Sequence, residues 1–153
     1  GVMRNMDIKL RPIESEEFDS LFSVVKQGIY SHVDAVFGWD DDFQRNRLKR
    51  DYDPSWFHWV EQGGQRIGML CFKPYDNAIH VHLLVVFPEF QNQKFGQKIM
   101  NYVHSRADAE GRNRVTLSSF IRNEAAVRFY KSLGYQLIDS DECFYSLSLQ
   151  IPS

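Results

Sequence analysis

The chain has 153 residues, 43% of them hydrophobic and 25% charged, a balance typical of a single globular domain (here residues 1–153) with one sizeable core. Its 18 basic and 20 acidic residues give a net charge of -2, which argues against a broad nucleic-acid-binding face. No apolar run approaches the roughly 18 residues that span a bilayer. No signal peptide is evident, so we expect a cytoplasmic protein, and Gly1 resembles a remnant of tag cleavage.

Hydrophobic periodicity predicts one mixed-sheet α/β domain with elements in the order β-α-α-β-β-β-α-β-α-β-β. The expected elements are a strand at 8–13, helices at 15–27 and 40–52, strands at 55–62, 65–73 and 78–87, a helix at 96–110, a strand at 115–120, a helix at 124–133, and strands at 135–138 and 143–149. The aromatic segment 28–38 is expected to be an irregular connection.

The two cysteines favour buried, reduced thiols over a metal site. Cys71 and Cys143 both lie in apolar, strand-like runs, and neither belongs to a CxxC pair. We therefore expect no zinc and no other metal.

The stretch from His80 to Lys98 has the order of elements that proteins use to bind phosphate. A buried strand stops at Pro88, a polar turn follows, and a helix begins at about Gly96. The free backbone N–H groups at such a helix start, and the positive end of the helix dipole, both favour an anion. A strand, turn and helix without any ligand explains these residues equally well.

A second segment, Asn123 to Tyr135, reads as a helix with a cap at each end. Asn123 is the expected N-cap and Gly134 the residue that ends the helix, and the residues expected to pack inward are Ala126, Phe129, Tyr130 and Leu133. Packing alone accounts for this pattern, and it also places Tyr130 where a proton donor would be useful.

Together the two segments resemble the GNAT acetyltransferase superfamily. The family pattern V-x-P, an aromatic residue and Q/R-x-x-G-x-G/A is similar to Val86, Pro88, Phe90, Gln91 and Gly96 of this chain. The family segment N-x-x-A-x-x-F/Y-Y-x-x-x-G-F/Y is similar to residues 123–135 at every defined position. The resemblance implies an α/β (α+β) fold with a mixed, mostly antiparallel sheet of six to seven strands and about four helices.

One residue departs from the family pattern. Lys94 stands where the family has its first glycine, which suits a backbone that approaches pyrophosphate closely and takes positive φ. A lysine can still donate its N–H there if its φ is negative, and its ammonium would add positive charge. Lys94 therefore either compensates in part or weakens coenzyme A binding.

The resemblance implies an N-acetyltransferase that moves an acetyl group from acetyl-CoA to a primary amine by direct attack, with a small-molecule amine favoured. A protein or peptide acceptor, or a non-catalytic coenzyme-A-binding or interaction domain, is the alternative. Tyr130 would protonate the leaving thiolate, and a strand N–H near Val86 would stabilise the oxyanion. The implied cofactor-binding residues are Leu84, Val85, Val86, Gln91, Asn92, Gln93, Lys94, Phe95, Gly96, Gln97 and Asn123.

His80 and His82 are the candidates for the base that deprotonates the amine. They lie two apart on one strand, so both project from the same face. The local string is similar to the H-x-H strand of arylalkylamine N-acetyltransferases, in which the pair is assigned to proton removal. Two structural histidines, Glu89 as the base, or a chain of water molecules are the alternatives.

The acceptor side is expected near the connection between the first two helices, where GNAT folds have their acceptor pocket. Tyr30, His32, Phe37 and Trp39 precede three aspartates, Asp40 to Asp42, and such a set would suit a cationic amine. A helix start explains the aspartates better, because the helix dipole alone favours them there. Pairing of exposed sheet edges would give a homodimer.

Overall fold

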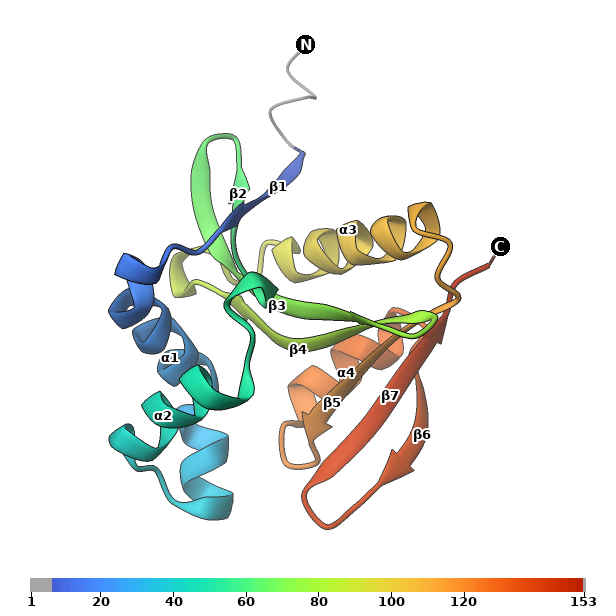
Figure 1. Ribbon diagram of the computed structural model, residues 1–153. Helices are drawn as coiled ribbons and strands as arrows, with labels where there is room; N and C mark the ends of the chain where they lie inside the picture. Colours follow the sequence, from blue (N-terminus) through green and yellow to red (C-terminus); the bar gives the residue numbers. More distant parts are fainter. Residues whose placement is uncertain (1–6, 153) are drawn as a thin grey trace. The chain divides into compact units, whose positions relative to one another are not determined.

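The computed structural model describes residues 7–152, so the expected tag remnant at Gly1 lies outside the described residues. The described elements follow the predicted order (Figure 1). They are β1 (Ile8–Pro12), α1 (Phe18–Phe37), α2 (Asp41–Asp51), β2 (Phe57–Gln62), β3 (Gln65–Tyr75), β4 (Ala78–Val86), α3 (Phe95–Ala109), β5 (Arg114–Phe120), α4 (Glu124–Ser132), β6 (Gln136–Ser140) and β7 (Phe144–Gln150).

The strands form a seven-stranded mixed sheet in the order β1-β2-β3-β4-β5-β7-β6. The pairs β1–β2, β2–β3, β5–β7 and β6–β7 are antiparallel, whereas β4 and β5 run parallel. The predicted fold class, an α/β fold with a mostly antiparallel sheet and about four helices, is confirmed.

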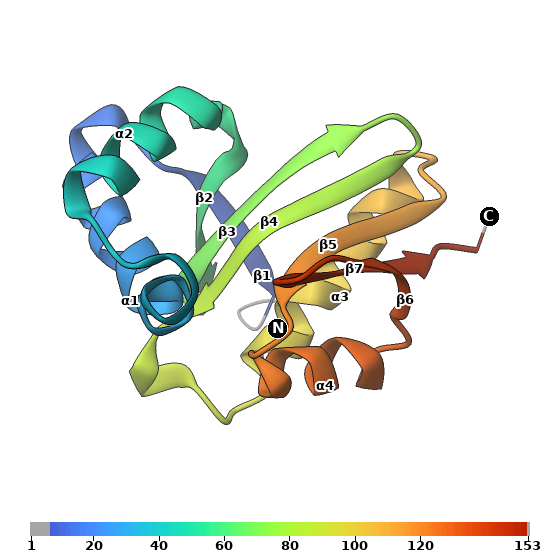
Figure 2. The same cartoon turned by 90° about the horizontal axis from the view of Figure 1, so that it is seen from below.

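The described residues divide into two compact units. The first comprises the residues up to Cys71 together with Leu83–Lys98, and the second comprises Phe72–His82 together with the residues from Ile99 onward. Strands β3 and β4 and helix α3 each contribute to both units, and the long β3–β4 hairpin is visible in Figure 2.

In the first unit, α1 and α2 lie side by side (Figures 1 and 2) and pack onto the inner strands. The buried cluster between them is Leu21, Phe22, Val25, Leu48, Phe57, Trp59, Met69, Cys71 and Val85. The aromatic content of the sequence therefore serves this core, because partly buried Phe18, Trp39, Tyr52, Trp56 and Phe87 pack around it.

Helix α1 is much longer than the sequence predicts, and the expected irregular connection at 28–38 is wrong. The helix continues through Gly28 to Phe37 and ends before Gly38, which has a φ of 79°. Gly28 is there for packing: a Cβ atom at this position would lie 2.7 Å from Cγ2 of Val85 in β4. A glycine within a helix costs about 1 kcal/mol relative to alanine, and here it lets the helix approach the strand closely.

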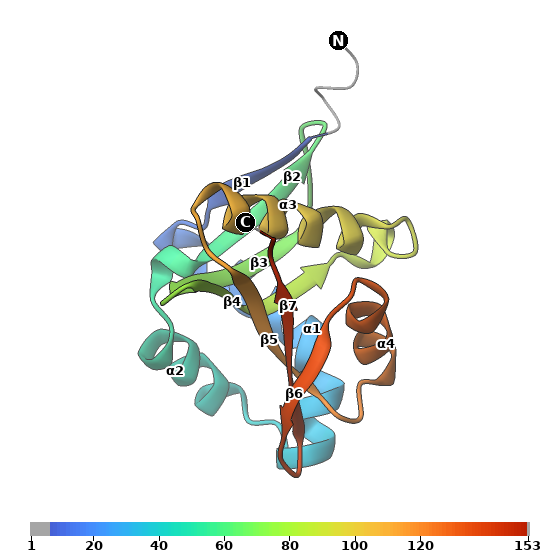
Figure 3. The same cartoon turned by 90° about the vertical axis from the view of Figure 1, so that its right-hand side faces the viewer.

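In the second unit, the register of the parallel pair β4–β5 runs from Ala78 opposite Arg114 to Val81 opposite Leu117. Helix α3 buries one stripe of its surface, formed by Ile99, Met100, Val103 and Ala107. Strand β6 lies at the edge of the sheet, next to β7 (Figure 3). All residues of β6 are exposed.

The two cysteines are free thiols in different surroundings. Cys71 in β3 is fully buried, and burial raises the pKa of its thiol. Cys143 is only half-buried and precedes β7, so the expectation of a buried thiol holds for Cys71 alone. Within residues 7–152, no helix combines the length and the apolar character that crossing a membrane requires.

Candidate active site

The end of β4 is held in the first unit by two glycines, neither of which the sequence analysis identified. Gly28 of α1 accommodates the side chain of Val85, and a Cβ atom on Gly68 of β3 would overlap the carbonyl oxygen of Val85. The strand end is therefore fixed from the helix side and from the neighbouring strand. An isolated glycine within an apolar strand indicates a close backbone approach, which is the signal that could have revealed Gly68.

A β-bulge in β3 adds to this arrangement. Val60 of β2 pairs with Gly68, but Glu61 pairs with Arg66, so Ile67 has no residue opposite it. The carbonyl of Ile67 accepts a hydrogen bond of 3.0 Å from the N–H of Phe87, just beyond β4. The residue that follows β4 is therefore bonded to the bulged residue of β3.

These contacts define the direction of the Val86 backbone. In a strand, the N–H and C=O of one residue point to the same side, and those of the next residue point to the opposite side. The Val85 carbonyl and the Phe87 N–H both point toward β3. The N–H and C=O of Val86 therefore point away from β3. The Val86 N–H takes no part in hydrogen bonding between β4 and β3.

Residues 91–97 form the turn that leads into α3, and their backbone suits an anion. Asn92 and Lys94 have φ values of 63° and 67°, whereas Gln93 between them does not have positive φ. Such alternation directs successive N–H groups into one concavity. The carbonyl of Lys94 accepts the N–H of Lys98 at 3.1 Å, so the first N–H groups of α3, at Phe95 to Gln97, have no partner within the helix. This geometry fits a pyrophosphate group.

Lys94 takes the conformation that the family's glycine would take. Its N–H was expected to serve the ligand only at negative φ, and the expectation of negative φ is wrong, because φ is 67°. Left-handed backbone costs a residue with a side chain roughly 1–2 kcal/mol. The turn keeps its shape in spite of the substitution, at the expense of local strain.

Two glutamine side chains brace the same turn. Nε2 of Gln91 donates to the carbonyl of Val86 at 2.9 Å, and Nε2 of Gln93 donates to the carbonyl of Glu89 at 3.1 Å. Both residues were predicted as cofactor-binding, and in the structure their side-chain amides donate to backbone carbonyls of the chain itself.

His80 and His82 lie together in the second unit, as predicted. Their rings are 4.7 Å apart and nearly perpendicular, and both residues are half-buried. Nδ1 of His80 is 2.8 Å from Oγ1 of Thr116 in β5, which orients the ring. Burial, and next the charge of Lys73, lower the pKa of His80 below 6.5, so this imidazole is neutral at pH 7.

Tyr130 lies on α4 in the same unit, within a cluster of aromatic rings. Its ring centroid is 5.0 Å from that of Phe129 and 5.6 Å from that of Tyr135, and burial raises its pKa to about 12. The phenol is therefore protonated at neutral pH, as an acid must be before it acts.

The end of α4 is what brings Tyr135 onto Tyr130. Gly134, with a φ of 100°, donates its N–H to the carbonyl of Lys131, and Tyr135 donates its N–H to the carbonyl of Tyr130. This pair of bonds is a Schellman motif, which places the residue after the glycine against the last turn of the helix. At the other end, Oδ1 of Asn123 accepts the N–H of Ala126 at 3.2 Å, so the predicted N-cap is confirmed.

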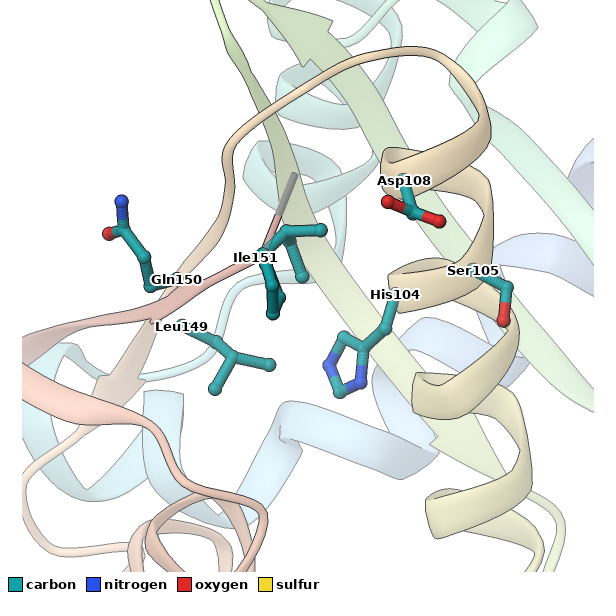
Figure 4. Close-up of a pocket in the computed structure, with 7 residues that line it drawn as sticks. His104, Ser105, Asp108, Leu149, Gln150 and Ile151 are labelled. Atoms are coloured by element: carbon teal, nitrogen blue, oxygen red, sulfur yellow. The ribbon is translucent and has the colours of Figure 1, made fainter.

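Behind this cluster, the hydroxyl of Tyr135 is 2.7 Å from Nε2 of His104 on α3. His104 also borders a surface pocket of about 410 Å³, which α3 and the end of β7 form (Figure 4). None of the residues predicted to bind acetyl-CoA or to act in catalysis lines this pocket.

The predicted acceptor residues of the first unit are arranged differently from the expectation. Tyr30 and His32 belong to α1 rather than to a connection. Asp40 is the N-cap of α2, and its side chain accepts the N–H of Phe43 at 2.9 Å, which confirms the helix-start explanation for this aspartate. Asp41 accepts Lys26 Nζ at 2.8 Å and Trp39 Nε1 at 2.6 Å, and these bonds lower its pKa.

Among residues 7–152, no three histidine, cysteine or acidic side chains gather as a metal ion would require. The groups that the two units do present are backbone N–H donors at the end of β4 and at the start of α3, a neutral imidazole, and a protonated phenol. Such groups can bind an anion, accept a proton and donate a proton.

The chain is similar to known acetyltransferases. The family model described as "Acetyltransferase (GNAT) family" matches residues 17–135. The aminoalkylphosphonate N-acetyltransferase of Salmonella typhimurium is 25% identical over 135 residues, covering 84% of this chain and 84% of that protein.

Solved structures give the same fold. PaiA N-acetyltransferase from Thermoplasma acidophilum, in complex with coenzyme A, has a TM-score of 0.73 at 16% identity and covers 95% of this chain and 99% of that one. The ribosomal-protein-S18-alanine N-acetyltransferase of Escherichia coli has a TM-score of 0.68 at 15% identity and covers 95% of each chain.

Proposed function

The chain belongs to the GNAT acetyltransferase family, with acetyl-CoA as co-substrate, and on this premise we propose that it acetylates the primary amine of a small molecule. The observation that carries the proposal is the 91–97 turn, whose alternating φ values and open N–H groups suit the pyrophosphate of coenzyme A. The choice of a small molecule is supported by the relative from Salmonella typhimurium, whose name describes an aminoalkylphosphonate acceptor.

In the proposed reaction, the amine nitrogen bonds to the acetyl carbon, the bond between that carbon and sulfur breaks, and the thiol leaves. The N–H of Val86 stabilises the negative oxygen that develops on the acetyl group, because it points away from β3. Tyr130 gives its phenol proton to the departing sulfur, which the protonated state of its side chain at neutral pH supports. Leu84 and Asn123 contact the pantetheine arm, whereas Val85 fixes the end of β4 through its contacts with Gly28 and Gly68.

The proton that the amine loses goes to the histidine pair in this proposal. His80 is neutral at pH 7, so it can accept a proton, and Thr116 orients its ring. Glu89 and a chain of water molecules remain the alternatives to His80 and His82.

Two rival functions make different predictions. A protein or peptide acceptor would give turnover with peptides and not with small amines; the structural likeness to the S18-alanine enzyme carries no weight here, because at 15% identity it concerns the fold. A non-catalytic domain was suggested by Lys94, whose φ of 67° keeps the turn in the shape that a glycine would allow, which favours a domain that binds coenzyme A. A non-catalytic domain of that kind would bind coenzyme A and release no thiol with any amine.

The test is release of coenzyme A thiol from acetyl-CoA across a panel of acceptors. The panel contains aminoalkylphosphonates, arylalkylamines, polyamines and short peptides with free N-termini. We expect turnover with at least one class of small amine. Turnover with peptides alone would replace the small molecule by a peptide, and absence of coenzyme A binding in calorimetry would overturn the proposal.

A homodimer also remains a prediction. The surface that it would cover is the edge strand β6, where Leu137 and Ile138 are 46% and 62% exposed. Sedimentation of the wild-type chain and of Ile138→Lys measures this: a dimer through β6 loses association in the variant, and a monomeric wild-type chain contradicts it.

A further inference from the structure

Gln91 connects the 91–97 turn to the end of β4. It is the first residue after the short helical turn Pro88–Phe90, and its own N–H donates to the carbonyl of Pro88 at 3.2 Å. From this fixed position its side chain reaches back five residues, and Nε2 donates to the carbonyl of Val86 at 2.9 Å. The segment that suits the pyrophosphate is therefore bonded to the residue whose N–H faces the acetyl group in the proposed reaction.

The bond matters because of the direction of the Val86 backbone. The N–H and C=O of Val86 point to the same side, away from β3. A negative oxygen that develops on this side is attracted by the N–H and repelled by the C=O, and both forces are strong where water is excluded. A donor bonded to the C=O weakens the repulsion and leaves the attraction unchanged.

The same bond also fixes the orientation of the donor. The peptide group between Val86 and Phe87 is held at both ends, because Gln91 binds its oxygen and Ile67 accepts its N–H. The preceding peptide group, which contains the N–H of Val86, is held where its oxygen packs against Gly68. A donor held in this way needs no reorganisation when charge develops.

We infer that Gln91 is a positioning residue for acetyl transfer, whose carboxamide screens the Val86 carbonyl and orients the adjacent N–H toward the developing oxyanion. This inference rests on the proposed function, since it concerns the same N–H. It gives the side chain of Gln91 a part in the rate of the chemical step, in addition to any part that its backbone has in binding coenzyme A.

The chain offers a matched control in Gln93. This residue lies in the same turn, and its Nε2 also donates to a backbone carbonyl, that of Glu89 at 3.1 Å. Alanine or glutamate at either position removes one brace of the turn, and glutamate adds one negative charge close to the expected phosphates. Both effects raise the KM for acetyl-CoA in both pairs of variants, so the discriminating quantity is kcat at saturating acetyl-CoA.

The experiment compares Gln91→Ala with Gln93→Ala, and Gln91→Glu with Gln93→Glu, by steady-state release of coenzyme A. We expect kcat to be about tenfold lower for Gln91→Ala than for Gln93→Ala, a smaller loss than removal of a direct oxyanion donor causes. Gln91→Glu should lose about a hundredfold relative to Gln93→Glu, because a carboxylate repels the Val86 carbonyl instead of donating to it. Equal kcat values within each pair would overturn the inference.

A readout independent of turnover separates this inference from the proposed function. Amide hydrogen exchange of Phe87 reports how firmly the Val86–Phe87 peptide is held. We expect faster exchange in Gln91→Ala than in Gln93→Ala, with unchanged exchange in the strands of the second unit. If the wild-type chain releases no coenzyme A with any amine, the proposed function fails; if Phe87 exchanges alike in both variants, the positioning role fails, whatever the acceptor.

Discussion

The 91–97 turn and helix α4 use their residues in opposite ways. In the turn, the groups suited to the ligand are backbone N–H groups, and the side chains of Gln91 and Gln93 shape that backbone. In α4, the backbone is an ordinary capped helix, and the group suited to chemistry is one side-chain oxygen, that of Tyr130. A segment that works through its backbone can therefore tolerate a substitution such as Lys94, whereas a segment that works through one atom cannot.

The largest loss of kcat is expected from removal of the Tyr130 phenol oxygen. Tyr130→Phe removes the phenol proton and should lower kcat by about 10²- to 10³-fold with little change in the KM for acetyl-CoA, as measured by coenzyme A release. Tyr135→Phe is the control, because it removes a hydroxyl from the ring beside Tyr130 and should lose only the stability that the bond to His104 provides. Equal kcat values for the two variants would show that a group other than Tyr130 protonates the leaving thiolate.

The next largest effect is expected from disturbing the backbone at the end of β4. Gly68→Ala forces a Cβ atom against the Val85 carbonyl, so we expect the free energy of unfolding in urea to fall by about 2 kcal/mol, together with a loss of kcat. Gly64→Ala is the comparison: its φ of 79° strains an alanine, but no atom lies within 4 Å, so stability should fall without a loss of kcat. A Gly68→Ala enzyme with full kcat would contradict the role of this contact.

A smaller effect is expected in the pH profile. A base must be neutral, so kcat/KM should fall as the pH drops through the pKa of His80, which burial and the charge of Lys73 hold below 6.5. Lys73→Met removes a positive charge and should move this acid limb to higher pH, whereas Lys9→Met on β1 should leave it in place. An acid limb that is the same in wild type, Lys73→Met and His80→Ala would point to Glu89 or water as the base.

The smallest effect, on the free energy of unfolding, is expected from replacing Lys94 in the 91–97 turn. Lys94→Gly relieves left-handed strain and should raise the free energy of unfolding by up to about 1 kcal/mol. If the ammonium contributes to phosphate binding, the KM for acetyl-CoA should rise a few-fold at low ionic strength and less at high salt. A lower stability of Lys94→Gly would show that the lysine side chain makes contacts that outweigh the strain.

The sequence predicts the order of elements because each strand and helix has its own periodicity. The ends of the helix between Asn123 and Gly134 were predicted closely, since its cap and its final glycine are local signals. Its inward face was predicted less well, because the fully buried residue of α4 is Val127. The end of α1 was not predicted, because Gly28 looks like a helix breaker until the side chain of Val85, distant in sequence, is placed against it.

The site was predicted less completely than the fold, for the same reason. Motif positions indicate which residues belong to the 91–97 turn, but the φ of Lys94 and the target of the Gln91 side chain depend on the folded turn. The bulge at Ile67 depends on the register of two strands, which no local pattern encodes. What the sequence leaves out is therefore the set of contacts that orients the backbone.

The reactivity of the buried Cys71 thiol can be used to measure how often the core of the first unit opens. A thiol that is fully buried and has a raised pKa reacts with a disulfide reagent only when the surrounding core transiently opens, whereas the half-buried Cys143 reacts without such an event. Because Cys71 packs in the same cluster as Val85, its labelling rate in Cys143→Ser would report the stiffness of the scaffold beneath β4. If acetyl-CoA binds along β4 as proposed, it should slow the labelling.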